Sequence, residues 1–314
     1  MTAGPEGVAI TPEGTLMVLD GLPESAFILQ EIRACGTTAV SMVAPTSRAR
    51  RLASRLMPPY LRHADAIVGL PDGVGERADL IVVPESELGI EEGRWLQRHR
   101  PGARVIMWFW NPVSEPLALA AQERGIEVWA FDPSDAARIK GVRLNTQYWF
   151  ASQVPDPREK LWDVSFVGRD KGRGQTIQVL ESALRGRGLT TNFQIVAPPS
   201  RLPWKQSAES WIPYREVIEQ SARSRAVLDI VQQGQTGMTL RAMEALYLEV
   251  KLITNNAAML QDPHYPQDNV YLLEGTELPG LEDFMSRPIA PTSEMVREFY
   301  SFPAWLRRFG TGIS

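Results

Sequence analysis

The sequence has few of the residues that staple a fold or hold a metal. Among 314 residues there are one cysteine, Cys35, and three histidines, His63, His99 and His264. A single cysteine forms no internal disulfide, which fits a reducing compartment, and Cys35 is best explained as a small buried hydrophobe. The histidines lack the spacing of a zinc site. We therefore expect a fold that depends on its hydrophobic core.

The sequence also lacks an excess of positive charge and a long apolar run. The formal net charge is -4 at pH 7, so no positive field attracts nucleic acid, and we expect no such partner. The longest apolar stretches, such as residues 104–110, are far shorter than the ~20 residues of a membrane span. No basic segment followed by an apolar run opens the chain, so no secretory signal is predicted. These absences predict a cytoplasmic protein.

One segment near the C-terminus leaves two explanations open. It combines Trp305, Arg307, Arg308 and Phe309, which suits a peripheral contact with the inner face of a membrane. A packed terminal helix explains the same residues, and we favour it.

Short apolar runs alternate with longer helical patterns along most of the chain. The expected strands are residues 16–20, 38–45, 64–70, 79–84, 104–110, 127–132, 162–168, 191–198, 225–231, 251–256 and 269–274. This alternation predicts parallel sheets with helices on both faces. The rhythm breaks over residues 141–160. Two prolines and four charges in QVPDPREK (153–160) suggest an interdomain linker near residues 150–160. We predict an α/β protein with two Rossmann-like domains, 1–152 and 153–314. The C-terminal tail either stays with the second domain or packs back on the N-terminal domain.

The first stretch that suggests chemistry follows the strand at 162–168. Its loop presents Arg169, Lys171 and Arg173 among glycines before a helix begins. Ligands of parallel α/β sheets bind beyond the carboxyl ends of the strands. Glycine lets a phosphate approach the backbone, arginine offers two donors and lysine offers a point charge. The loop therefore suits a diphosphate, although a solvated turn explains the same residues.

The second stretch is the loop that follows the strand at 225–231. Four residues are placed to offer backbone N–H groups at the start of the next helix: Gln235, Thr236, Gly237 and Met238. The positive end of a helix dipole and its unpaired N–H groups form an anion site. Thr239 either adds to this site or acts only as the N-cap of the helix.

Within that helix, Arg241 and Glu244 are three residues apart and share a face. They form either a surface ion pair or part of a ligand site. In the second case the Glu244 carboxylate accepts hydrogen bonds from ribose hydroxyls, and Arg241 faces phosphate or sugar. Spacing alone does not separate these two explanations.

Taken together, the motifs resemble a known family. The chain carries FVGRDKGR (166–173), LDIVQQGQTGMTLRAMEAL (228–246) and KLITNN (251–256), preceded by WNP (110–112) and FDPSDA (131–136). This set is similar to the GT-B glycosyltransferases of bacterial lipopolysaccharide and capsule biosynthesis. The resemblance covers roughly residues 80–275, and the part from Leu228 to Asn256 is the most specific.

The resemblance implies two Rossmann-like domains whose parallel sheets face each other across a cleft, with a nucleotide-sugar donor bound by the C-terminal domain. Arg169 and Lys171 would contact the donor diphosphate, residues 235–239 would cradle it, and Glu244 would hold the ribose. The acceptor would be a glycan, a lipid-linked sugar or a small molecule. One departure concerns the E-x7-E motif of many retaining members, whose first glutamate falls near Gly237, where this chain has no carboxylate. The contacts with the sugar therefore stay open.

Sugar transfer requires neutralisation of the leaving diphosphate and, in inverting enzymes, a base for the acceptor hydroxyl. No DxD sequence stands where a metal-dependent transferase has one, so we expect no essential metal and no cofactor beyond the nucleotide sugar. The weak candidates for the base are Asp20 and Glu24, in the turn after the first strand, and Asp132, at the end of another. A role in a solvated turn or a helix cap is favoured for each.

Three functions remain compatible with this pattern. The leading hypothesis is a glycosyltransferase. The alternatives are a nucleotide-sugar epimerase of the same two-domain fold and a non-catalytic subunit for carbohydrate assembly. A dinucleotide-dependent oxidoreductase is disfavoured, because neither half has Gly-x-Gly-x-x-Gly after its first strand.

Overall fold

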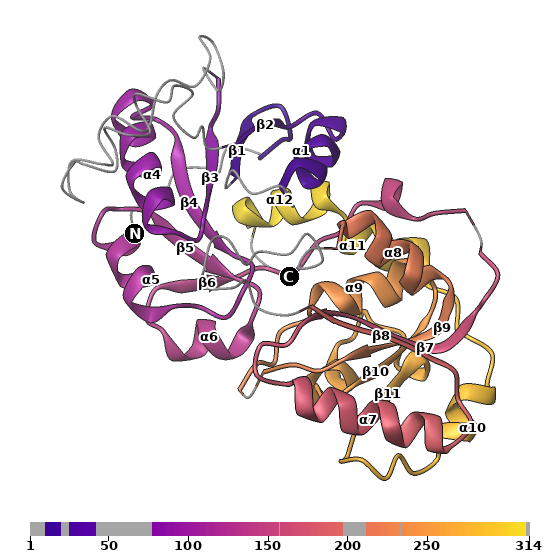
Figure 1. The fold of residues 1–314 in the computed structure, drawn as a ribbon. Coiled ribbons are helices and arrows are strands. Elements are labelled where there is room, and N and C mark those ends of the chain that lie inside the picture. The colour runs from indigo at the N-terminus through magenta and orange to yellow at the C-terminus, as the bar shows by residue number, and fades with distance from the viewer. Residues whose placement is uncertain are drawn as a thin grey trace, which may run out of the picture. The chain divides into compact units, whose positions relative to one another are not determined.

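The computed structural model describes residues 10–19, 25–41, 77–156, 158–196, 212–232 and 234–311. The chain forms two compact units (Figure 1). Unit 1 comprises Met1–Thr146 and Phe302–Ser314, and unit 2 comprises Gln147–Ser301. The structural division thus follows Thr146, whereas the sequence placed it after residue 152.

The described part of unit 1 holds a six-stranded parallel sheet in the order β2-β1-β3-β4-β5-β6. Its strands are β1 (Thr15–Leu19), β2 (Thr38–Ser41), β3 (Leu80–Pro84), β4 (Arg104–Phe109), β5 (Glu127–Ala130) and β6 (Val142–Leu144). The helices are α1 (Ser25–Ala34), α4 (Glu87–His99), α5 (Glu115–Gln122), α6 (Pro133–Arg138) and α12 (Phe302–Thr311). The expected strand at 64–70 lies outside the described residues.

Strand β6 corrects the expectation that the rhythm breaks at residue 141. It pairs in parallel with β5, with Val142 opposite Val128 and Leu144 opposite Ala130. Three residues are too few to show an alternating pattern, so the sequence offers no signal for this strand. The segment therefore extends the first sheet before the chain enters unit 2.

Successive side chains of the strands in unit 1 point to opposite faces of the sheet. On β4, Val105 and Met107 join the core cluster beneath α4, α5 and α6. On the other face, the Trp108 ring meets Trp305 of α12 edge-on, with ring centroids 5.2 Å apart. Because a strand turns successive side chains to opposite faces, the continuous apolar run of β4 requires helices on both.

The Trp- and Arg-rich C-terminal segment is the packed helix α12. Trp305 is fully buried, and its carbonyl oxygen accepts a 3.0 Å hydrogen bond from the Asn145 side chain. The Arg308 side chain is also buried and donates to the Asn145 amide oxygen at 2.9 Å. The preference for a packed terminal helix is therefore confirmed. Within the described ranges, no helix combines the length and apolar character needed to cross a bilayer.

Unit 2 contains, within the described residues, a five-stranded parallel sheet in the order β11-β10-β9-β7-β8. Its strands are β7 (Trp162–Arg169), β8 (Thr191–Val196), β9 (Ser224–Asp229), β10 (Lys251–Thr254) and β11 (Val270–Leu272). Its helices are α7 (Gly174–Gly186), α8 (Tyr214–Ala222), α9 (Leu240–Tyr247), α10 (Leu281–Ser286) and α11 (Glu294–Phe299), with the 3-10 helices η1 (Ala151–Gln153), η4 (Ala257–Gln261) and η5 (Gln267–Asn269).

The helices of unit 2 cover both faces of its sheet. Side chains of α7 and α10 form one core cluster with residues of β7 and β9, such as Phe166 and Leu228. Helices α8 and α9 lie together on the opposite face (Figure 1). The predicted α/β class with two parallel sheets is thus confirmed.

Candidate functional site

The order of strands in unit 2 marks one place where a ligand can enter. Strand β7 lies between β8 and β9. The chain leaves β7 through α7 toward β8, and later returns through α8 to β9 on the other side. Loops that follow β7 and β9 therefore part to opposite faces of the sheet. A crevice opens at such a switch point, beyond the carboxyl ends of the strands.

The loop after β7 is a left-handed turn that exposes two cations. Lys171 and Gly172 have φ values of 46° and 79°, a region in which a non-glycine residue is uncommon. An oxygen of the Asp170 carboxylate accepts a 2.5 Å hydrogen bond from the Gly174 amide, which closes the turn at the start of α7. Arg169, the last residue of β7, and Lys171, within the turn, are both exposed. The turn therefore presents its positive charge at the carboxyl edge of the sheet.

A buried carboxylate links this loop to β9. Asp229, the last residue of β9, is 5% exposed, and burial raises its pKa above the usual range. The charges of Arg241 and Arg173 oppose that rise, and the hydroxyl groups of Thr239 and Thr254 bond the carboxylate. Arg173 belongs to the β7 loop, so the two segments share one electrostatic environment.

Arg241 joins the same environment from helix α9. Its guanidinium donates a hydrogen bond to the carbonyl oxygen of Val167 on β7 and lies 5.0 Å from the centroid of the Phe166 ring. A Cβ added to Gly168 would stand 3.3 Å from the Arg241 Nη2 atom. Glycine at position 168 therefore leaves room for this arginine, and α9 is bound to the strand that carries the cationic turn.

The loop between β9 and α9 carries backbone N–H groups at the start of α9. Thr239 is the N-cap of α9, since its side chain accepts from the Ala242 amide at 3.2 Å. The Asn256 side chain donates to the carbonyl oxygens of Thr236 and Gly237, both at 3.2 Å. Within the described residues, the amides of Gly237 and Met238 donate no hydrogen bond. Asn256 thus anchors the loop by its carbonyls, and these two N–H groups, which belong to buried residues, have no acceptor among the described residues.

Known proteins show which fold this chain resembles. No family model and no curated protein matches the sequence. Among solved structures, AviGT4, a glycosyltransferase involved in avilamycin A biosynthesis, aligns with a TM-score of 0.55 at 13% identity, covering 95% of this chain and 98% of that one.

Two other structures align less closely. One is MnaA of S. aureus with UDP, at a TM-score of 0.44 and 9% identity over 94% of both chains. The other is the glycosyltransferase SnogD of Streptomyces nogalater, at 0.36 and 16% identity over 91% of this chain and 98% of that one. The likeness to AviGT4 decides the fold.

The chain has a GT-B glycosyltransferase-like fold. This confirms the fold that the sequence motifs implied. The roles of individual residues in this GT-B chain stay predictions, because a likeness at 13% identity bears on the fold alone.

Glu244 and Gln235, which the sequence also assigned to the donor site, lie in buried or half-buried positions of unit 2. Glu244, on α9, is 2% exposed, and its carboxylate oxygens accept hydrogen bonds from the Tyr214 hydroxyl at 3.2 Å and the Ser221 hydroxyl at 3.5 Å. Burial raises the pKa of Glu244, and the charge of Arg241 opposes the rise. Glu244 is thus an internal residue of unit 2 and not half of a surface ion pair. Gln235 is half-buried in the loop before it.

Of the three candidates for the base, one is described. Asp132 is 1% exposed and caps α6, because its carboxylate accepts from the Ser134 amide at 2.9 Å and the Ser134 hydroxyl at 2.8 Å. The helix-cap explanation is therefore confirmed for Asp132. Asp20 and Glu24 lie outside the described residues.

Sequence reasoning did not single out Asp229 or Asn256 as site residues. A carboxylate that ends an otherwise apolar strand is a signal for Asp229, since the carboxyl end of a parallel strand is where ligands bind. Asn256 shows its role only through contacts with a loop twenty residues earlier in the chain. No group of three His, Cys, Asp or Glu side chains in the described residues is arranged to hold a metal ion.

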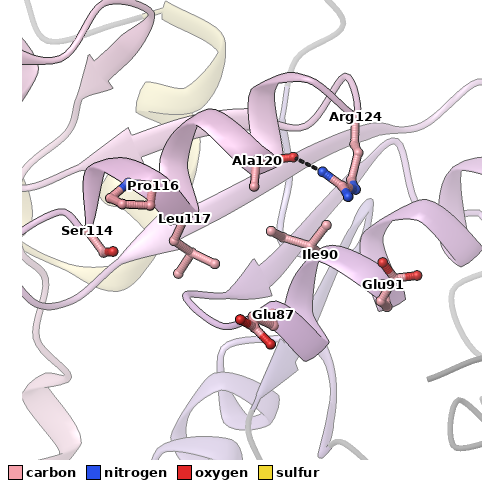
Figure 2. Close-up of a pocket in the computed structure, with 8 residues that line it drawn as sticks. All are labelled: Glu87, Ile90, Glu91, Ser114, Pro116, Leu117, Ala120 and Arg124. Carbon is pink, nitrogen blue, oxygen red and sulfur yellow. Dashed lines mark hydrogen bonds between the residues drawn. The ribbon is translucent and has the colours of Figure 1, made fainter. Parts of the chain in front are cut away.

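The structure also has a groove in unit 1, between α4 and α5 (Figure 2). Its volume is about 500 Å³, and its lining includes the carboxylates Glu87 and Glu91 and the apolar Ile90 and Leu117. Arg124 points its guanidinium back to the Ala120 carbonyl at 2.8 Å. The groove lies along helix surfaces instead of at the strand ends of the GT-B fold, so it is not the candidate site.

Proposed function

We propose that the chain is a glycosyltransferase that moves a sugar from a nucleotide-sugar donor to an acceptor hydroxyl. Unit 2 binds the donor with its diphosphate at the switch point between β7 and β9. The acceptor is a glycan, a lipid-linked sugar or a small molecule, as in the lipopolysaccharide and capsule enzymes that the sequence resembles. The reaction needs no metal ion and takes place in the cytoplasm. With a lipid-linked acceptor, the enzyme works at the inner face of the membrane.

The observation that carries this proposal is the convergence of four segments on one edge of the unit 2 sheet. The β7 turn brings Arg173, β9 ends in Asp229, α9 brings Arg241, and the loop before α9 offers the amides of Gly237 and Met238. Cations and a helix N-terminus at one edge form an anion site. In Rossmann-like units, nucleotides bind beyond the carboxyl ends of the parallel strands, which is the edge where these groups lie.

The chemistry assigned to these groups concerns the leaving group. When the bond between the sugar and the diphosphate breaks, negative charge grows on the departing phosphate oxygens. Positively charged side chains and fixed N–H dipoles stabilise that charge more than they stabilise the bound substrate, which accelerates the step. Arg169, Lys171 and Arg173 supply the charge from one loop, and Arg241 and residues 235–239 supply donors from the other.

Glu244 is assigned to the ribose of the donor. Its carboxylate already accepts two hydroxyl hydrogen bonds, from Tyr214 and Ser221. A ribose diol offers the same pair of hydroxyl donors, and a carboxylate has acceptor capacity for more than two. The support for this role is the chemistry of the carboxylate and its place on the helix that carries Arg241.

A binding screen followed by a transfer assay tests the proposal. Thermal shift with UDP, GDP, dTDP and CMP sugars identifies the donor, because a ligand that binds only the native state raises its melting temperature. We expect a shift with a nucleoside diphosphate sugar and a loss of most of it in Lys171→Ala. The matched control is Arg185→Ala, whose exposed side chain pairs with Glu181 on α7.

The same assay separates the alternatives. Release of nucleoside diphosphate together with a glycosylated acceptor supports the transferase. A changed sugar that remains attached to the nucleotide, formed from donor alone, supports the epimerase instead. Binding without turnover of donor in the presence or absence of acceptors supports a non-catalytic subunit. No shift with any nucleotide sugar contradicts the proposal altogether.

A further inference from the structure

Asp229 is a carboxylate held in the interior of unit 2. It is the last residue of β9, it lies opposite Thr254 of β10 in the parallel register, and it is 5% exposed. Among the described residues, Asp229 forms no direct ion pair. Burial disfavours the charged form of a carboxyl group because that form loses its water. The neutral form of Asp229 is therefore easier to reach than that of an exposed aspartate.

Every hydrogen bond to Asp229 from the described residues comes from a hydroxyl group. Thr254 bonds one carboxyl oxygen at 3.4 Å, and Thr239 supplies the second hydroxyl. Both hydroxyl oxygens are fixed by backbone N–H groups, of Asn256 at 3.1 Å and of Ala242 at 3.2 Å. A hydroxyl donates to a carboxylate or accepts from a carboxylic acid, whereas an N–H group only donates. The partners of Asp229 therefore suit both of its protonation states.

Charged groups face Asp229 from the β7 turn and from α9. Arg173 on the turn and Arg241 on the helix both favour the carboxylate form of Asp229. Glu244, also on α9, is a second buried carboxylate, and its charge acts against that form. Tyr265 stays neutral, because burial and the charge of Asp229 raise its pKa. Two arginines therefore hold the balance between the charged and neutral forms of Asp229.

These two arginines are also the ones assigned to the diphosphate of the donor. A bound diphosphate offsets their positive charge and adds repulsion, in surroundings where charges are poorly screened by water. Both effects disfavour a negative charge on Asp229. Protonation removes that charge, and the hydroxyls of Thr239 and Thr254 keep a hydrogen-bonding role beside the neutral group.

We propose that Asp229 takes up a proton when the nucleotide sugar binds, so that the donor site is tightest at acid pH. This inference rests on the proposed function and deepens it. The proton comes from solvent, stays on a carboxyl oxygen of Asp229 while the donor is bound, and returns to solvent when the site empties. Asp229 thus acts through the charge of the site and takes no part in bond breaking.

The sign of the pH dependence follows from linkage between the two equilibria. A bound anion raises the pKa of Asp229, so the affinity is highest at a pH where the free protein already carries the proton. The affinity then falls as pH rises from the pKa of the free protein to that of the complex, and it levels off above. Uptake of one whole proton corresponds to about a tenfold increase in Kd per pH unit.

Calorimetry of the wild-type chain measures the proton directly. The probes are UDP-glucose, GDP-mannose and dTDP-glucose, of which the one with the largest thermal shift is titrated from about pH 5 to about pH 8.5. Buffers with different ionisation enthalpies report the protons exchanged. Both phosphates of these probes are diesters, so they lack the monoester ionisation near pH 6. We expect uptake of roughly 0.3–1 proton per site and at least about a fivefold change in Kd over the range.

Asp229→Asn separates the charge of this residue from its shape, because the amide keeps an acceptor oxygen for the two hydroxyls. We expect its Kd to vary by less than about twofold over the same range and to be lower than that of the wild type at pH 8.5. A purely structural role predicts weaker binding at every pH instead. The control is Asp268→Asn, an exposed residue of η5 before β11, at the opposite edge of the sheet, which should keep the wild-type slope.

Infrared difference spectra of protein labelled with ¹³C-aspartate add a direct signature. Addition of the probe should produce a carboxylic acid band in the wild type that is absent in Asp229→Asn. Circular dichroism shows whether the variant is folded, and the wild-type measurements test the proposal even if it is not.

No net proton uptake by the wild type, or an unchanged slope in Asp229→Asn, would overturn the role of Asp229 while leaving the donor site in place. Weaker binding of Asp229→Asn at every pH would do the same. By contrast, failure of all three probes to bind the wild type at any pH contradicts the proposed function itself. The two failures are therefore distinguishable.

Discussion

The Tyr214 hydroxyl donates a 3.2 Å hydrogen bond to Oε1 of Glu244, so a buried carboxylate joins α8 to α9. Removal of this carboxylate takes away the acceptor that Glu244 provides to the hydroxyls of Tyr214 and Ser221. We expect Glu244→Ala to lower the free energy of unfolding by about 1–3 kcal/mol and to weaken nucleotide-sugar binding. Glu244→Gln, which retains one acceptor oxygen, separates the two effects. Urea unfolding and calorimetry measure them, and unchanged affinity in both variants would remove Glu244 from the donor site.

Gly168 allows a direct test of the place of Arg241. The new Cβ of Gly168→Ala would stand 3.3 Å from Arg241 Nη2 and 3.4 Å from the Phe166 ring, so the guanidinium must shift. We expect about a 5- to 50-fold weaker Kd for the nucleoside diphosphate, equivalent to roughly 1–2 kcal/mol. Gly186→Ala is the control, because nothing lies within 4 Å of its added Cβ. Equal affinities in the two variants would show that Arg241 does not contact the diphosphate.

Glu92 makes the stability of unit 1 depend on pH. It is 8% exposed, its Oε2 atom has no hydrogen-bond partner among the described residues, and burial raises its pKa from 4.5 to about 8. Between these values the unfolded chain is the more fully ionised, so the free energy of unfolding falls as pH rises from about 4.5 to about 8 and levels off above. The loss is at most about 5 kcal/mol.

Glu92→Gln should remove this dependence. We expect the variant to unfold at higher urea concentration than the wild type at pH 9 and at nearly the same concentration at pH 4.5. Glu91→Gln, a change at a half-exposed neighbour that pairs with Arg94, should follow the wild-type curve. Parallel curves for the wild type and Glu92→Gln over pH 4.5–9 would show that Glu92 is not buried as the structure has it.

Helix α12 is expected to carry a large part of the stability of unit 1. Trp305 is fully buried between Trp108 and Phe309, with ring centroids 5.2 Å and 4.6 Å away. Trp305→Ala should lower the free energy of unfolding by about 3–5 kcal/mol, since a large cavity replaces the ring. The exposed neighbour Arg307 is the control, and Arg307→Ala should cost under about 1 kcal/mol. A small effect at position 305 would contradict the packing of this helix.

Sequence patterns predicted most of the elements because most of them are long enough to show a period. Strand β4 is a run of apolar residues buried on both faces, and α7 has apolar residues at helical spacing with a glycine at its end. The short strand β6 has only three residues and no such signal. Its existence depends on pairing with β5, which is a tertiary contact that composition does not encode.

The candidate site was predictable in part. The cations of the β7 loop follow from the rule that ligands bind beyond strand ends, and Thr239 was recognised as a possible cap. The charge contact between Arg173 and Asp229 was not, because the two residues are far apart in the chain and meet only through the order of strands. The burial of Glu244 was missed for a similar reason, since Tyr214 and Ser221 come from a different helix.

The return of α12 to unit 1 has a consequence for how the protein is made. The Trp108 side of the first sheet is covered by residues 302–311, so unit 1 lacks part of its core until these residues have been synthesised. Unit 2, which is continuous in the chain, has its whole sequence earlier. On the ribosome, the second unit is therefore able to finish folding before the first.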